Sequence, residues 1–251
     1  MSSEQVAKAA PRQTGVLRGG ALPGRYAEAL RQSLPPDLQP LAPFFADLSR
    51  LDTLAEMLDQ HLDTGPHGAA RRILNVGCGP MATELFCGAL QGREMVSIDY
   101  TQAFVAFGHH LQSERLLTGV EIVHADIMAA IWPEGHFDAI LLHDILYEDA
   151  LDIADLLPKL STFLISGGYV YLDVMDARVR WLWRLLGRER SYRRYTQGEL
   201  STALHRAGLS EIERQPLRPR GGLVRQVLHR LLRCGGVSNA FALSTRKALV
   251  R

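Results

Sequence analysis

The chain has 251 residues, of which 47% are hydrophobic and 22% charged, so it can form one large domain with extensions. No run approaches the roughly 18 apolar residues of a membrane span, and residues 1–20 lack the apolar stretch of a signal peptide. The cysteines are only Cys78, Cys87 and Cys234, without a Cys-x-x-Cys or Cys/His cluster, which predicts a cytoplasmic protein without a metal site.

The net charge of +1 hides an asymmetry. Residues 1–177 hold 11 Lys and Arg against 23 Asp and Glu, whereas residues 178–251 hold 17 against 4. Residues 178–251 therefore form a basic third of the chain. This basic third is suited to an anionic substrate, a carrier, nucleic acid or a membrane surface. Alternatively, it only neutralises the acidic body.

The first part of the chain is predicted to be a flexible tail, residues 1–20, followed by a helical cap, residues 21–68. Two helices are expected in the cap, at 25–33 and 40–62, separated by Leu34-Pro35-Pro36. The second has an apolar stripe with a helical period, which runs from Leu41 and Phe44 to Leu58.

From residue 69 to residue 251 short apolar strands alternate with helices. Strands are expected at 72–76, 94–98, 120–124, 137–142, 168–174, 209–216 and 239–248, and helices at 81–91, 101–116, 149–164 and 196–207. This alternation predicts an α/β fold: a doubly wound, mostly parallel seven-stranded sheet with helices on both faces, plus the N-terminal helical extension.

The first strand runs into the turn Asn75-Val76-Gly77-Cys78-Gly79-Pro80, and the second strand ends on Asp99. Glycines let a ligand approach the backbone closely, and an acid after the next strand can accept hydrogen bonds from ribose hydroxyls. The order strand, glycine turn, helix and acid is therefore typical of a nucleotide-binding site. The simpler interpretation of Asp99 is a helix N-cap.

Several further motifs follow one another along the chain in the same order as in a known family. Residues 71–215 thereby resemble the Rossmann-like, class I S-adenosylmethionine-dependent methyltransferases. The expected strand at 239–248 would be the last strand of that fold. The motifs are the glycine turn, Asp99, Val123 to Ile127, Phe137 to Leu146, Leu164 to Asp173 and Tyr195 to Leu209. The chain departs from the family pattern at Asn75, where an acid is usual, at Met81, which replaces a third glycine, and in a helical insertion at 218–238.

The resemblance implies S-adenosylmethionine as cofactor, with Asp99 on the ribose and Asp126 on the adenine; Asp126 could equally cap a short helix. The implied cofactor-binding residues are Asn75, Gly77, Cys78, Gly79, Asp99, Tyr100, Asp126, Ile127 and His143.

In this family, the segment after the fourth strand lies where the substrate contacts the methyl group of the cofactor. It holds the catalytic candidates His143, Asp144 and Tyr147. His143 is the natural general base, because an imidazole titrates near neutrality. The competing interpretation is a structural histidine held by hydrogen bonds.

Residues 176–195 are expected to form a lid in which arginines alternate with Trp181, Trp183 and leucines. The predicted substrate-binding residues are Tyr26, Trp181, Arg193 and Tyr195. An amphipathic helix packed on the core explains the segment equally well. In a third interpretation, residues 178–190 and 221–234 lie together on an anionic membrane.

The sequence as a whole predicts a cytoplasmic methyltransferase that acts on O or N of a small anionic or aromatic metabolite. Nucleic acid is a less favoured substrate, because no (Asn/Asp)-Pro-Pro-(Tyr/Phe) motif follows the fourth strand. One alternative is an enzyme that attacks the cofactor's aminocarboxypropyl arm and releases methylthioadenosine. The other is a non-catalytic cofactor-binding partner or membrane-associated protein. The sequence does not fix the oligomeric state.

Overall fold

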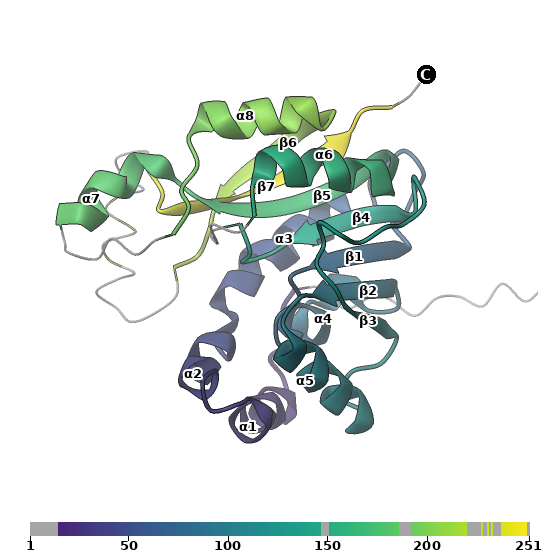
Figure 1. Ribbon diagram of the computed structural model, residues 1–251, viewed down its shortest axis with the longest axis vertical. Helices are drawn as coiled ribbons and strands as arrows, with labels where there is room; N and C mark the ends of the chain where they lie inside the picture. The colour runs from purple at the N-terminus through teal and green to yellow at the C-terminus, as the bar shows by residue number, and fades with distance from the viewer. Residues whose placement is uncertain are drawn as a thin grey trace, which may run out of the picture.

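The computed structural model describes residues 15–146, 151–185, 192–219 and 237–249, together with residues 227, 230 and 232. Seven strands form one sheet in the described part (Figure 1). They are β1 (Arg72–Val76), β2 (Glu94–Asp99), β3 (Val120–His124), β4 (Phe137–Leu142), β5 (Leu164–Met175), β6 (Leu209–Pro216) and β7 (Ala240–Lys247).

The strand order is β3-β2-β1-β4-β5-β7-β6, and only β7 runs antiparallel to its neighbours β5 and β6. The predicted mostly parallel, doubly wound sheet is confirmed. The order reverses between β1 and β4, and ligands of such sheets bind beyond the carboxyl ends of the strands at this point.

Helices cover both faces of the sheet (Figure 1). One face packs against the N-terminal helices and α5, and the other against α6 and α8. The helices are α1 (Leu22–Ser33), α2 (Ala42–Phe45), α3 (Leu51–His61), α4 (Ala82–Phe86), α5 (Gln102–Ser113), α6 (Ile153–Phe163), α7 (Arg180–Leu185) and α8 (Gln197–Arg206). Short 3₁₀ turns are η1 (Gln39–Leu41), η2 (Leu48–Arg50), η3 (Gly88–Leu90) and η4 (Ala177–Val179).

Two predicted helices are broken. The region 40–62 is divided into η1, α2, η2 and α3, because Asp47 caps a new turn by accepting the N–H of Ser49. As a result, Leu41 and Phe44 are exposed rather than part of one buried stripe.

The predicted helix at 81–91 stops at Phe86, because Cys87 is extended and bridges to Val16. The N–H of Leu17 donates to the carbonyl of Phe86. Val16 and Leu17, which were expected to belong to a flexible tail, are therefore paired with this segment. The tail's residues 1–14 lie outside the described residues, and the domain boundaries stay a prediction.

Gly108 of α5 makes room for a side chain from the glycine turn. A Cβ at this position would lie 2.6 Å from Met81 Cε and 2.8 Å from Ile122 Cδ1. Met81 is completely buried and adopts a left-handed backbone with φ of 63°. The absence of a side chain at Gly108 thus lets methionine stand where the family pattern has a third glycine.

We expect Gly108→Ala to lower the free energy of unfolding by less than about 1 kcal/mol, because the added methyl meets mainly the far ends of the Met81 and Ile122 side chains, which must shift, while alanine gains helix propensity. The matched control is Gly198→Ala, also within a helix but with open space around its Cα. It should gain about 0.5–1 kcal/mol from helix propensity. Denaturant unfolding of both variants measures the difference, and equal effects would contradict the packing argument.

Candidate active site

The glycine turn lies tightly against the end of β4. Gly77 has φ of +66°, and a Cβ there would lie 2.4 Å from Ile145 Cγ2. The N–H groups of Gly77 and Cys78 donate to the Ile98 carbonyl at 2.8 and 3.2 Å. A residue other than glycine at position 77 would thus displace either this turn or the segment after β4.

Asp99 is buried at the end of β2, next to this turn. Its carboxylate accepts the N–H of Gly79 at 2.9 Å and that of Thr101 at 2.8 Å. Each carboxylate oxygen has a second acceptor position, so the group fits a pair of ribose hydroxyls. Tyr100, the next residue, is 67% exposed beside it. The predicted ribose-binding acid and the glycine turn are therefore in direct contact.

Asp126 follows β3 and accepts the N–H of Met128 at 2.8 Å, and Ile127 is buried between them. The aspartate therefore makes the local turn contact expected of a capping residue. Its carboxylate stays exposed, so this contact leaves an adenine amino group room to bind.

Asn75 does not face open space. Its amide donates to Glu84 Oε1 at 2.7 Å, and the hydroxyl of Ser97 donates to the same oxygen. Burial raises the pKa of Glu84 above its ordinary value, although both hydrogen bonds oppose the shift. Asn75 is therefore tied to α4 through Glu84.

His143, Asp144 and Asp173 meet at the carboxyl edge, between β4 and β5. His143 Nδ1 lies 2.8 Å from Asp173 Oδ2, and the N–H of Asp144 donates to both oxygens of Asp173. Since Asp173 acts as acceptor for Asp144, Nδ1 carries the proton in its bond to Asp173. His143 Nε2 is buried, has no hydrogen-bond partner among the described residues and lies 4.0 Å from Asp144 Oδ2, so no hydrogen bond of the fold uses its lone pair.

Arg50, from η2 of the N-terminal cap, forms an ion pair with Asp144. Both side chains are largely buried, at 11% and 13% exposed. Sequence reasoning missed both Arg50 and Asp173. Arg50 stands alone among leucines, 94 residues before its partner, so no local pattern marks it. Asp173 lies near the end of an expected strand, and nothing else in the sequence marks it as a site residue.

Three ligand-type side chains meet here, His143, Asp144 and Asp173, with ligand atoms within 4.8 Å of one another. His143 and the N–H of Asp144 both bond to Asp173, and Arg50 pairs with Asp144, so the fold itself supplies a partner to each of the three side chains.

Two of the predicted substrate-binding residues are tied into the fold. The hydroxyl of Tyr26 donates to the Pro80 carbonyl at 3.0 Å, which joins α1 to the glycine turn. Tyr195 is 1% exposed, and its N–H donates to the Met175 carbonyl at the end of β5. Both lie next to the carboxyl edge, and direct contact with substrate stays a prediction.

The lid residues differ in their surroundings. Arg193 pairs with Asp152 at 3.0 Å and lies over the ring of Tyr195. Trp181 is 63% exposed on α7, whereas Trp183 is buried and donates to Asn239 Oδ1 at 2.6 Å. The third catalytic candidate, Tyr147, and the arginines at 188 and 190 lie outside the described residues, as does most of the insertion at 218–238.

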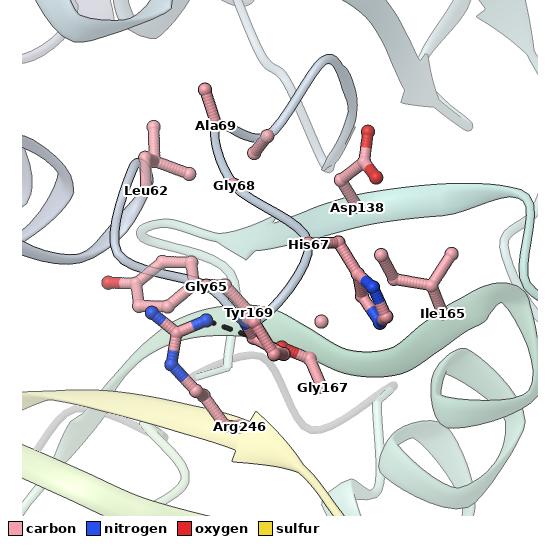
Figure 2. Close-up of a pocket in the computed structure, with 13 residues that line it drawn as sticks. Leu62, Gly65, His67, Gly68, Ala69, Asp138, Ile165, Gly167, Tyr169 and Arg246 are labelled. Carbon is pink, nitrogen blue, oxygen red and sulfur yellow. Dashed lines mark hydrogen bonds between the residues drawn. The ribbon is translucent and has the colours of Figure 1, made fainter. Parts of the chain in front are cut away.

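A shallow hollow exists far from these residues, at the amino end of β5 (Figure 2). Its polar groups are bonded within the fold. Arg246 donates to the Gly167 carbonyl, His67 contacts the Ser166 carbonyl, and Asp138 accepts the N–H of Arg71. These contacts close the loops at this edge and leave no polar group directed at a ligand.

Residues 74–172, from β1 to β5, match a family model described as a methyltransferase domain. No curated protein matches the chain. In fold the chain is similar to geranyl diphosphate C-methyltransferase from Streptomyces coelicolor A3(2), with a TM-score of 0.59, 14% identity and coverage of 92% of this chain and 99% of that one.

It is also similar to the N-methyltransferase NodS from Bradyrhizobium japonicum WM9, with a TM-score of 0.51, 17% identity and coverage of 77% and 93%. The [4+2]-cyclase SpnF has a TM-score of 0.56 at 17% identity, with coverage of 80% and 82%. Because the fold also occurs in a cyclase, these structures alone do not determine the reaction.

The buried Glu84 predicts a pH-dependent stability. A carboxyl group whose pKa is raised by folding stabilises the protein fully below its unfolded pKa, and this contribution is lost as pH rises toward the folded pKa. Glu84→Gln keeps the Oε1 acceptor but cannot ionise. Its free energy of unfolding should therefore exceed that of the wild type increasingly above about pH 4.5, by ~1.4 kcal/mol per pKa unit of the shift.

Thermal unfolding between acidic and neutral pH measures this difference, with Glu94→Gln on the exposed end of β2 as control. If Glu84→Gln were less stable than the wild type by the same amount at every pH, the ionised carboxylate would be the form that the fold prefers.

Proposed function

We propose that this chain, a class I S-adenosylmethionine-dependent methyltransferase, transfers the methyl group to an oxygen or nitrogen of a small anionic or aromatic metabolite. The observation that carries the proposal is the buried pair of His143 and Asp173 at the carboxyl edge, with Nε2 available to accept a proton. Methylation of a hydroxyl or a protonated amine needs such a base.

The glycine turn and Asp99 hold the cofactor in this proposal. Gly77 and Gly79 present backbone without a Cβ, and the Asp99 carboxylate accepts the two ribose hydroxyls. The other proposed cofactor contacts are Asn75, which acts through Glu84, and Cys78, Tyr100, Asp126, Ile127 and His143. Bound S-adenosylmethionine supplies a methyl group on a sulfonium, which is reactive once it is aligned with a nucleophile.

His143 acts on the acceptor. The Nδ1–H donates to Asp173, which fixes the ring orientation and stabilises the imidazolium that forms. The Nε2 lone pair would take the proton of the acceptor oxygen or nitrogen that receives the methyl group. Asp144 is proposed to position the segment through its ion pair with Arg50, and Tyr147 remains a candidate.

An anionic acceptor is supported by the charge of residues 178–251, which hold 17 Lys and Arg against 4 Asp and Glu. Tyr26, Arg193 and Tyr195 are the proposed substrate contacts, whereas the ring of Trp181 is exposed on α7. The similar structures share only 14–17% identity with this chain and therefore support its fold alone. Their substrates do not indicate the substrate of this chain. A cytoplasmic location is supported by Cys78 and Cys87, which are buried free thiols.

Asp99→Ala should weaken S-adenosylmethionine binding by about 1.5–3 kcal/mol, the usual contribution of hydrogen bonds to a charged group. Calorimetry measures this change. Asp99→Asn should lose less, because an amide oxygen still accepts one bond. The control is Asp155→Ala on the exposed side of α6. Unchanged affinity in a folded Asp99→Ala protein would remove the ribose assignment.

His143→Ala should lower kcat by ~10²–10⁴-fold and change the cofactor Kd much less, because the base acts on the acceptor. The rate of S-adenosylhomocysteine release and its pH profile test this effect, with His109→Ala on the exposed face of α5 as control. A normal rate and pH profile would leave His143 a structural role. Release of methylthioadenosine instead would mean that the aminocarboxypropyl arm is attacked.

A further inference from the structure

We propose that α7 docks this protein on the surface of a membrane that contains anionic lipids. The docking surface consists of Arg180, Trp181, Arg184 and Leu185, which we call the α7 face. It follows β5 after the short turn η4 and extends beyond the end of that strand at one side of the molecule (Figure 1).

The four residues form one continuous arc of the helix. At 100° per residue, positions 180, 184, 181 and 185 follow one another over about 140°. All four are exposed, with Trp181 at 63% and Leu185 at 76%. Val179 and Trp183 lie on the opposite side and are buried, at 1% and 6% exposed. The exposure of Trp181 and Leu185 is therefore a consequence of how the helix is oriented.

That orientation is fixed by polar contacts on the buried side. Trp183 Nε1–H donates to Asn239 Oδ1 at 2.6 Å. Arg194 donates to the same oxygen at 3.3 Å and to the Asp176 carbonyl at 3.1 Å. Rotating α7 to bury Trp181 would break the Trp183 bond and expose its ring. The fold thus holds an indole and a leucine side chain in water beside two guanidinium groups.

An anionic membrane is the occupant that fits this combination. Tryptophan is preferred at the boundary between headgroups and acyl chains, and arginine is attracted to anionic headgroups. The chain from residue 178 onward carries 17 Lys and Arg against 4 Asp and Glu, so the surrounding segment has the same sign. No helix in the described residues is long and apolar enough to cross a bilayer, so docking would be peripheral.

Ile131 is an exposed apolar residue without this setting. Ile131 is 88% exposed, but it lies in a loop after β3, close to Glu134 and far in sequence from any arginine. It serves as a matched control for nonspecific adhesion.

The experiment uses the full chain without substrate, so that its outcome does not depend on the proposed chemistry. Flotation is measured with phosphatidylcholine vesicles and with vesicles that contain about 30% phosphatidylglycerol, at about 0.05 M and 0.5 M salt. We expect binding to the anionic vesicles at least ~10-fold stronger than to the neutral ones, reduced by salt. Trp181→Ser/Leu185→Ser should lose ~10-fold or more, Arg180→Gln/Arg184→Gln should lose the lipid preference, and Ile131→Ser should bind like the wild type.

Tryptophan fluorescence supplies a second readout. The wild type should shift to the blue with anionic vesicles, and the conservative Trp181→Phe should keep binding but lose most of the shift. The proposal is overturned if the wild type does not bind anionic vesicles, or if the Ser double variant binds normally. Equal loss in Ile131→Ser also overturns it. Salt-sensitive binding to single-stranded RNA, without vesicle binding, would assign the α7 face to nucleic acid instead.

Discussion

The reactive corner depends on one buried carboxylate, that of Asp173, which is 1% exposed. A carboxylate is stable in such a position only when donors satisfy its oxygens. His143 Nδ1 and the N–H of Asp144 do so, and the hydroxyl of Tyr171 adds a longer contact at 3.5 Å. The ring orientation of His143 and the left-handed backbone of Asp144, with φ of 61°, are therefore both set by a residue of the neighbouring strand. Removing Asp173 would change the position and the tautomer of the proposed base together.

The N-terminal cap is joined to the same edge through polar contacts. Arg50 reaches Asp144 at the reactive corner, and Tyr26 reaches the Pro80 carbonyl in the glycine turn. Removing either member of the buried ion pair would leave a charge without its partner, which is far more destabilising than losing a surface pair. The cap is therefore coupled to both the cofactor turn and the proposed base. A substrate anion that attracts Arg50 would act on Asp144 and, through it, on the segment after β4.

The sequence predicted the sheet well because each strand is a short apolar run bounded by turn residues. Only β5 differs noticeably, since it begins at Leu164 and not at residue 168. The helix break at Phe86 was missed because its cause is distant: Cys87 is held extended by the segment around Val16. The break at Asp47 has a local cause, a cap on Ser49, which the apolar stripe outweighed in the prediction. Among the site residues, Asp99 and His143 are visible because they follow strands. Glu84, Arg50 and Asp173 are not, because a buried carboxyl in a helix or a lone arginine among leucines has no local signature.

The basic third shows why a charge count identifies a partner only after the fold is known. Arg193 pairs with Asp152 and Arg194 binds Asn239, so these two arginines hold the lid segment to the body, whereas Arg178 pairs with Asp176 within the lid. Arg180 and Arg184 lie on the exposed arc of α7. The two tryptophans divide in the same way, because two residues along a helix correspond to a rotation of about 200°. A sequence in which arginines and tryptophans alternate therefore places one set in the fold and presents the other to solvent. Only the exposed side chains can contact a binding partner, so they determine what this face of the protein binds.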